Sequence, residues 1–222
     1  MSHLTRRGIC VLMSGGLDSA VLLHRVQASH RRVAPLYVRC GLRWEAAERY
    51  WLRRYLKAVR VPGLEPLRVA PMSLPSLYGA HWSLTGRGVP SARSVDSAVY
   101  LPGRNVLLLS AAAILCAQQG LSTIALGILK GNPFGDASPE FLAQMARCLT
   151  IALRHPIRIV APLRQLSKTD LLRSRDTIPF ELTFSCLRPR GRLHCGRCNK
   201  CAERARAFRT AGVWDPTRYA NR

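Results

Sequence analysis

A serine- and glycine-rich hexapeptide near the N-terminus contains residue types that suit phosphate chemistry. It reads Ser-Gly-Gly-Leu-Asp-Ser over positions 14–19, after the apolar run 8–13 and before a second apolar stretch at 20–23. This order predicts a strand, a tight turn and a helix. Because the N-terminus of a helix offers unpaired N–H groups and the positive end of its dipole, the segment is typical of an anion-binding site.

The residues of this hexapeptide favour a nucleotide as the anion. Gly15 and Gly16 let the backbone turn sharply and approach a phosphate group without interference from a Cβ atom. Ser14 and Ser19 add hydroxyl donors, and Asp18 is suited to hold a magnesium ion against the phosphates. A glycine turn that merely caps a helix is the alternative. We expect ATP to contact the strand-to-helix segment Met13, Ser14, Gly15, Gly16, Leu17, Asp18, Ser19, Ala20, Val21, Leu22 and Leu23.

Four cysteines near the C-terminus form a second group of chemical interest. Within sixteen residues they follow the pattern Cys186-x8-Cys195-x2-Cys198-x2-Cys201. In a reducing compartment such a thiolate cluster is typical of a metal site, and four sulfurs match tetrahedral zinc in a structural role. An iron–sulfur cluster uses the same ligands and is the alternative. His194 is expected beside the cluster or on the surface, and basic neighbours such as Lys200 favour the thiolate form.

Composition limits the class of protein. The chain is 48% hydrophobic, which is enough for a sizeable core, and its apolar runs are far shorter than the ~20 residues that cross a bilayer. The run at 8–13 leads straight into the hexapeptide, so we reject a secretory signal and expect a cytoplasmic protein with no membrane segment. The remaining cysteines are expected in the core: Cys10, Cys40, Cys116 and Cys148.

The formal charge of +22 suggests a polyanionic partner at first sight. Only four of the 34 basic residues are lysines, however, and the arginines are spread along the whole chain. A solvated basic surface is therefore the preferred interpretation, and a face that binds RNA or an acidic protein partner is the alternative.

Strand and helix patterns alternate along the chain and predict an α/β fold with a parallel sheet covered on both faces. Pro35 indicates that the second strand lies near a sheet edge. The segment 72–103, rich in Ser, Gly and Pro, is expected to be a long active-site loop. Later strands are expected at 33–38, 67–69, 123–128 and 157–160, and helices at 17–29, 44–59, 107–119, from Ser138 and Pro139 onward, and from 167–170 onward.

The hexapeptide resembles the pyrophosphate loop (PP-loop) of the ATP pyrophosphatases, which cleave ATP between its α and β phosphates. Other segments are similar to the 7-cyano-7-deazaguanine synthase family of queuosine biosynthesis: 101–105, Leu163 with 168–171, 183–186, and the tail 186–219. The resemblance covers nearly the whole chain. It implies an adenine nucleotide α-hydrolase-like, Rossmann-like domain over residues 1–180 and a small four-cysteine zinc subdomain over residues 181–222.

The resemblance also implies an activity. In the family, ATP adenylates the carboxylate of 7-carboxy-7-deazaguanine, ammonia displaces AMP to give an amide, and a second ATP activates that amide on the way to the nitrile. Ser14 and Asp18 are expected to hold the departing pyrophosphate, and Lys168 and Arg104 to neutralise developing charge. ATP, magnesium and zinc are the implied cofactors, and a homodimer is the implied assembly.

Two segments depart from the family pattern. Members carry Tyr-Gly-Gln-x-His after the second strand, where this chain has Leu42 and Trp44 in place of two polar residues. In the shorter loop 127–141, which should face the deazaguanine, Asn132 takes the place of an acidic residue. We expect these departures to change which substrate the protein accepts more than its ability to transfer AMP. There are two alternatives: an enzyme that adenylates a macromolecule, or a nucleotide-binding module without turnover. His81 is a minor candidate for a functional residue.

Overall fold

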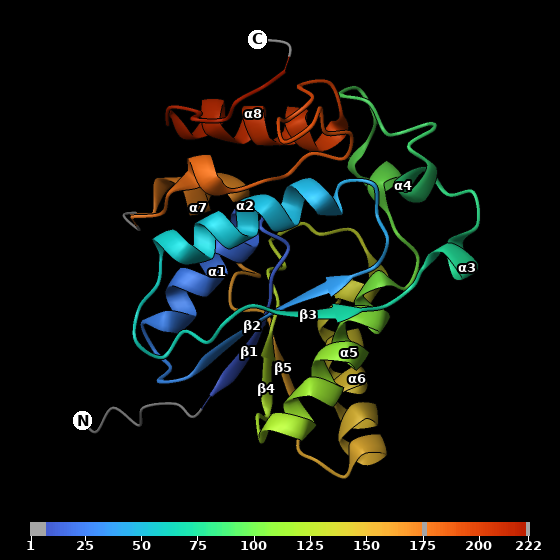
Figure 1. The fold of residues 1–222 in the computed structure, drawn as a ribbon, viewed down its shortest axis with the longest axis vertical. Helices are drawn as coiled ribbons and strands as arrows, with labels where there is room; N and C mark the ends of the chain where they lie inside the picture. The colour runs from blue at the N-terminus through green and yellow to red at the C-terminus, as the bar shows by residue number, and fades with distance from the viewer. Residues whose placement is uncertain (1–7, 175–176, 221–222) are drawn as a thin grey trace.

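The computed structural model describes residues 8–174 and 177–220. At its centre is a five-stranded sheet in which neighbouring strands are parallel, in the order β3-β2-β1-β4-β5 (Figure 1). The strands are β1 (Ile9–Leu12), β2 (Val33–Arg39), β3 (Arg68–Pro71), β4 (Thr123–Ala125) and β5 (Arg158–Val160). The parallel α/β class predicted from the alternation of patterns is confirmed.

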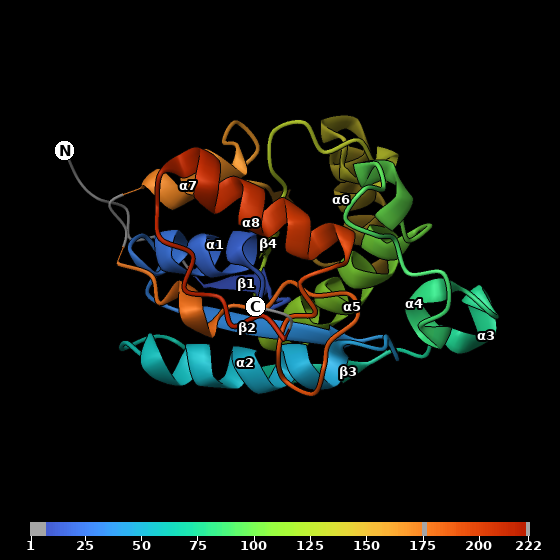
Figure 2. The same cartoon turned by 90° about the horizontal axis from the view of Figure 1, so that it is seen from above.

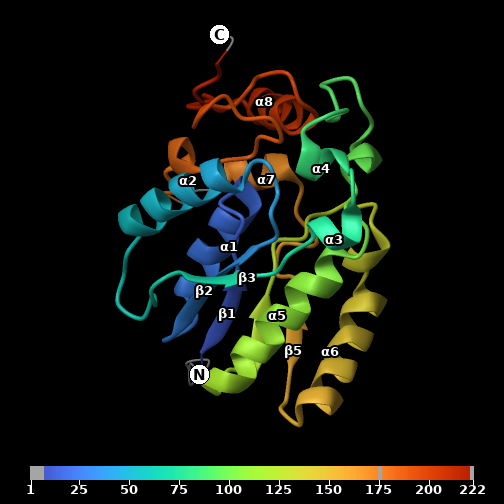
Figure 3. The same ribbon diagram turned by 45° about the vertical axis from the view of Figure 1, so that its right-hand side comes forward.

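Different helices cover the two faces of the sheet. The helices are α1 (Leu17–Gln27), α2 (Glu45–Ala58), α3 (Pro75–Tyr78), α4 (Trp82–Thr85), α5 (Arg104–Gln119), α6 (Pro139–Leu153), α7 (Lys168–Arg173) and α8 (Asn199–Ala211). In Figures 1 and 3, α1 and α2 lie on one face and α5 and α6 on the other. Along β1, Ile9 and Val11 belong to the core beneath α1 and α2, whereas Cys10 and Leu12 belong to the core beneath α5. Burial on both faces explains the continuous apolar runs of the strands.

The order in which the chain adds strands to the sheet reverses between β1 and β4. The chain first adds β2 and β3 on one side of β1, and then returns to add β4 and β5 on its other side. Such a switch point leaves a crevice at the carboxyl ends of the two central strands, and ligands of open parallel sheets bind there. α8 lies across this end of the molecule (Figures 1 and 2), and it packs against α7.

Pro35 lies in β2, which is not an edge strand but is the neighbour of the edge strand β3. β2 pairs with β3 only from Leu36 onward, so Pro35 precedes that ladder.

Two other fold predictions need correction. The segment 72–103 is not irregular throughout, because it folds into α3, α4 and a 3-10 turn at Asp96–Val99. Cys148 is exposed on α6, whereas the other three single cysteines are buried as predicted.

Element boundaries shift in ways that matter for the site. β4 ends at Ala125, earlier than predicted, so that Gly127 lies beyond the strand. α5 starts at Arg104 rather than at residue 107, which brings Arg104 and Asn105 into its first turn.

The division of the chain into a domain over 1–180 and a subdomain over 181–222 stays a prediction. Within the described ranges, no helix combines the length and the apolar character that a membrane crossing requires.

Candidate nucleotide and metal sites

The phosphate loop, residues 14–19, joins β1 to α1 at the carboxyl edge of the sheet. Gly15 has a φ of +78°, in the left-handed region, and a Cβ atom there would lie 3.3 Å from Leu52 Cβ. Both the backbone conformation and the packing therefore require glycine. The Gly15 carbonyl accepts a hydrogen bond of 2.7 Å from the Phe184 N–H, which fixes the loop against the segment that leads to the cysteine cluster.

The N-terminus of α1 presents donors to an anion. Its N-cap is Gly16, which makes no side-chain cap hydrogen bond, whereas the serine N-caps of α6 and α7 accept hydrogen bonds from their own first turns. Ser14 Oγ accepts from the Gly16 N–H at 3.3 Å, and Ser19 Oγ donates to the Gly16 carbonyl at 3.1 Å. The two serine oxygens are 3.4 Å apart. Two hydroxyls and a helix end thus meet at one point, an arrangement that suits a phosphate group.

A cavity of about 270 Å³ adjoins this loop. It lies at the switch point, because Ser14, Asp18 and Ser19 line it together with Tyr37 of β2 and Gly127 after β4. A pocket that combines apolar walls with a few convergent polar groups is the usual form of a small-molecule site. The other lining residues are Leu12, Met13, Val38, Val99, Tyr100, Leu101, Arg104, Asn105, Leu108, Leu126, Ile128, Asn132, Phe134, Asp136 and Lys200.

Asp18 belongs to a network of ion pairs between α1, α7 and α8. Lys168 Nζ lies 3.6 Å from Asp18 Oδ2 and 2.6 Å from Glu203 Oε1, and Lys200 Nζ lies 2.7 Å from Glu203 Oε2. Burial raises the pKa of Asp18, and Lys168 opposes that rise. Burial also acts to raise the pKa of Glu203, but the two lysines outweigh it and hold the pKa at about 2. Asp18 Oδ1 is buried and has no hydrogen-bond partner among the described residues, so it is suited to hold a cation.

The two basic residues predicted to neutralise charge occupy different places. Arg104 lines the cavity, and its Nε is buried without a hydrogen-bond partner in the described part of the chain. Lys168 instead lies between Asp18 and Glu203, and the described lysine that lines the cavity is Lys200. The roles of Arg104 and Lys168 stay predictions. The position of Lys200 in this cavity could not be predicted from the sequence, where it is marked only by its place between two cysteines.

A buried acid lies behind the cavity wall. Glu48 on α2 accepts a hydrogen bond of 2.7 Å from the hydroxyl of Tyr37, which itself lines the cavity. Burial raises the pKa of Glu48 to about 7, although the charge of Arg104 and the hydrogen bond from Tyr37 act in the opposite direction. No local pattern indicates this pair, because a glutamate on an amphipathic helix is usually exposed.

The loop between β4 and α6 forms another wall of the cavity. Asn132, Phe134 and Asp136 all line the cavity. Phe134 stacks on Tyr100 with 5.0 Å between the ring centroids, and Asp136 Oδ2 accepts a hydrogen bond of 3.0 Å from the Asn105 N–H. The loop therefore offers a carboxylate and one ring of an aromatic pair to a ligand, and Tyr100 before α5 supplies the other ring. Asn132 replaces the acidic residue of the family pattern.

The other departures from the family pattern do not line this cavity. Leu42 and Trp44 are 5% and 4% exposed and belong to the hydrophobic core. Trp44 stacks on Trp82 of α4 with 5.7 Å between the ring centroids. Leu42 and Trp44 therefore contribute to core packing, and their effect on the choice of substrate stays a prediction. His81 accepts a hydrogen bond from the Ser83 N–H and caps α4.

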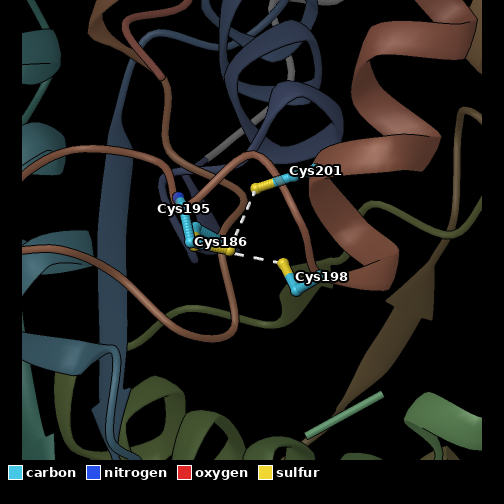
Figure 4. A group of neighbouring side chains, drawn as sticks. All are labelled: Cys186, Cys195, Cys198 and Cys201. Carbon is cyan, nitrogen blue, oxygen red and sulfur yellow. Dashed lines mark hydrogen bonds between the residues drawn. The ribbon is translucent and has the colours of Figure 1, made fainter. Parts of the chain in front are cut away.

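The four predicted cysteines converge on one point (Figure 4). Their Sγ atoms all lie within 4.8 Å of one another, with 3.9 Å between Cys195 and Cys201 and 4.0 Å between Cys186 and Cys198. Four sulfurs around a tetrahedral ion at about 2.3 Å would lie about 3.8 Å apart, so these distances match a single four-coordinate metal. Backbone N–H groups also donate to the sulfurs, as from Cys195 to Cys186 Sγ at 3.2 Å.

His194 connects the cysteine cluster to the phosphate loop. It is 5% exposed, so the prediction of a neighbour of the cluster holds and the surface alternative does not. Burial lowers the pKa of His194 to about 3, which keeps the ring neutral, and its Nε2 accepts a hydrogen bond of 3.1 Å from the Ser185 N–H. The ring also contacts Phe184 at a centroid distance of 4.5 Å. Phe184 in turn donates to Gly15.

Comparisons with known proteins agree with this architecture. A family model described as queuosine biosynthesis protein QueC matches residues 8–212. The 7-cyano-7-deazaguanine synthase of Anaeromyxobacter dehalogenans (strain 2CP-C) is 34% identical over 97% of this chain and 96% of that protein. The synthase of Methanothrix thermoacetophila (strain DSM 6194 / JCM 14653 / NBRC 101360 / PT) is 33% identical over 96% of this chain and 98% of that protein.

A solved structure of a 4-thiouridine synthetase in complex with RNA, with bound ATP, aligns with a TM-score of 0.51 and 16% identity. The alignment covers 92% of this chain and 50% of that one, and at this identity it supports the fold alone. The family match extends from before the phosphate loop to the end of the helix that follows the cysteine cluster. The chain therefore belongs to the QueC family of queuosine biosynthesis proteins.

Proposed function

We propose that this protein is an ATP-dependent carbon–nitrogen ligase that converts 7-carboxy-7-deazaguanine and ammonia into 7-cyano-7-deazaguanine. The observation that carries the proposal is the similarity of nearly the whole chain to 7-cyano-7-deazaguanine synthases. The phosphate loop of this chain also lines a cavity at the switch point of the sheet. Adenylation of a macromolecule is not favoured, because the curated relatives are named for a small base. The proposed location is the cytoplasm, where ATP is available and thiols stay reduced.

The reaction uses ATP twice. A carboxylate oxygen of the substrate attacks the α-phosphorus of ATP and pyrophosphate leaves; ammonia then attacks the acyl carbon, AMP leaves, and loss of a proton gives the amide. The amide oxygen attacks a second ATP in the same way. Breaking its C–O bond expels AMP, and loss of the remaining N–H protons leaves the nitrile. Activation of oxygen by ATP replaces a direct dehydration, which is unfavourable in water.

The phosphate loop is proposed to bind the departing pyrophosphate. Ser14 and the first N–H groups of α1 supply donors that are already oriented before the substrate arrives, while Ser19 holds the turn through the Gly16 carbonyl. Such preorganised donors stabilise charge that develops in a transition state. Arg104 lines the same cavity and carries a buried, unpartnered Nε, which supports a role in neutralising the substrate carboxylate or a phosphate. Lys168 is proposed to assist from behind Asp18.

Asp18 is the proposed magnesium ligand. Its buried and unpartnered Oδ1 fits a cation that is shared with phosphate oxygens. When bound, the ion would offset the negative charge of the triphosphate. The ion pair with Lys168 Nζ at 3.6 Å holds the other carboxylate oxygen, so that the side chain is already oriented.

The loop from 127 to 141 is proposed to contact the deazaguanine. A flat heteroaromatic base can pack against the stacked rings of Tyr100 and Phe134. The base also carries N–H donors, and the carboxylate of Asp136 in the cavity wall is an acceptor for such donors.

Zinc is the proposed metal of the cysteine cluster, because four thiolates at these separations match its tetrahedral coordination. All four ligands come from the protein, so the role is structural. The ion would hold together the connection 186–198 and the start of α8, a stretch with few apolar side chains of its own. A homodimer, and contact of the basic surface with RNA or an acidic protein, stay predictions.

The proposed function is tested with purified protein, ATP, magnesium, ammonia and the carboxy-base, with mass spectrometry of the product. We expect the nitrile together with pyrophosphate. Ser14→Ala and Asp18→Ala should abolish turnover while the thermal unfolding midpoint stays near that of the wild type, whereas Ser110→Ala on α5 should keep turnover. A folded, metal-loaded protein that forms neither nitrile nor pyrophosphate would contradict the function. Retained turnover in both loop variants would contradict the position of the ATP site.

A further inference from the structure

Lys200 occupies an unusual position between the metal cluster and the nucleotide cavity. It lies in the first turn of α8, between the cluster residues Cys198 and Cys201, yet its side chain lines the same cavity as Ser14, Asp18 and Ser19. The side chain is 30% exposed, compared with 18% for Lys168. Of the two lysines that pair with Glu203, Lys200 is therefore the one that a ligand in the cavity can reach.

We propose that Lys200 binds the phosphate tail of ATP, as a second basic residue next to the phosphate loop. The inference rests on the proposed function only in taking ATP as the occupant of the cavity. The ammonium group supplies three donors and a full positive charge, and it reaches the cavity from α8 rather than from α1. Lysine is suited to this task because it acts on phosphate as a compact point charge.

Glu203 holds Lys200 in place. The two residues are one helical turn apart on α8, and their charged groups are 2.7 Å apart. The other oxygen of the Glu203 carboxylate binds Lys168 at 2.6 Å, so one acid positions both lysines. A flexible lysine loses rotamer freedom when it binds a ligand, and this pre-existing contact reduces that loss.

The backbone of Lys200 is fixed from both sides. Cys198 and Cys201 on either side of it belong to the four-sulfur cluster, and Asn199 Nδ2 donates to the Ser94 carbonyl at 2.9 Å. The segment before the cluster is in turn bonded to the phosphate loop through the Phe184 N–H and the Gly15 carbonyl at 2.7 Å. Lys200 thus stands on a framework that is anchored to the same loop whose ligand it is proposed to bind.

The charge balance of the network explains why Lys200 matters for an anion. When both acids are ionised, Asp18 and Glu203 contribute two negative charges and Lys168 and Lys200 two positive charges, so these four groups balance one another. Without Lys200 a net negative charge would lie beside the phosphate loop and would repel a triphosphate. Hydrogen bonds to charged groups contribute about 1.5–3 kcal/mol, and this corresponds to a loss of roughly 10- to 100-fold in ATP affinity.

The test compares Lys200→Met with Lys57→Met in the full-length, metal-loaded protein. Lys57 is exposed on α2, so the control variant loses the same net charge at a different place. Isothermal titration calorimetry with ATP, pyrophosphate and AMP measures the affinities. We expect Lys200→Met to bind ATP and pyrophosphate roughly 10- to 100-fold more weakly and to bind AMP like the wild type. Lys200→Arg should recover most of the loss, and Lys57→Met should bind all three ligands like the wild type.

The outcomes separate this inference from the proposed function. If wild type binds ATP and Lys200→Met binds it equally well, the role of Lys200 is refuted while the function stands. An equal loss for AMP, or a lower unfolding midpoint and metal content in Lys200→Met, shows a structural role and also overturns the proposal. If the wild type binds neither ATP nor pyrophosphate, the proposed function itself fails.

Discussion

Substitution of Gly127 tests how far the activity depends on the exact position of the first turn of α1. It follows β4 and packs on the first turn of α1, where a Cβ atom would lie 3.2 Å from the Asp18 carbonyl carbon and 3.3 Å from its oxygen. Its φ is not positive, so alanine is compatible with the backbone and Gly127→Ala changes the contact alone. The neighbouring atoms are backbone and cannot turn away. The first turn of α1 must therefore move by a few tenths of an ångström.

This small movement acts on the residues proposed to bind phosphate. Overpacking of this kind costs about 1–3 kcal/mol of stability, and functional groups tolerate displacements of only about 0.5 Å. We expect kcat/KM for nitrile formation to fall by at least roughly 10-fold in Gly127→Ala, since a misplacement of about 1 Å can cost about 100-fold. The fold itself should persist, because the strained contact is a single one.

The assay is steady-state pyrophosphate release, with urea denaturation of the same samples. Gly135→Ala is the matched control, because a Cβ atom at Gly135 meets nothing within 4 Å and its φ is not positive. Gly135 lies in the same loop between β4 and α6. Unchanged kcat/KM in Gly127→Ala, or an equal loss in Gly135→Ala, would refute the idea that contact with Gly127 sets the position of α1.

Three further predictions concern stability. Because Glu48 has a pKa of about 7 in the fold against an ordinary 4.5, stability should fall by roughly 3 kcal/mol as pH rises from about 4.5 to about 7. Glu48→Gln should remove this slope in urea titrations across that range, and an unchanged slope contradicts the assignment. Trp44→His, which restores the residue of the family pattern, should destabilise the protein by about 3 kcal/mol, because the smaller ring leaves buried space unfilled and weakens the stack on Trp82. A stability equal to wild type in denaturation contradicts this. Elemental analysis should find one zinc ion per chain, and its removal by a chelator should lower the unfolding midpoint; a midpoint that stays constant argues against a structural metal.

Much of the site could be predicted because its signals are local. The strand, glycine turn and helix around Gly15 follow one another directly in the sequence, and the geometry of a helix N-terminus does not depend on distant residues. The spacing of the four cysteines likewise limits their chemistry before any fold is known. The capped helix at Ser138 was predicted with its N-cap, because capping is decided within one turn.

The residues that escaped prediction depend on contacts between distant segments. Glu48 meets Tyr37 only because α2 packs over β2. Trp44 finds its partner Trp82 in a segment that sequence reasoning treated as irregular. Lys200 reaches the cavity at the switch point because α8 returns to the carboxyl edge of the sheet, which no local pattern reveals.

The connections between the two sites argue against a metal centre that only stabilises the end of the chain. The Phe184 N–H bonds the diglycine turn, His194 packs on the Phe184 ring, and Lys200 extends from the cluster into the cavity. A disturbance at the sulfurs would therefore displace both the phosphate loop and the side of the cavity that Lys200 lines. Since binding groups must be held rigidly to act on a transition state, a metal held by these four cysteines would act on the proposed reaction through position rather than through chemistry.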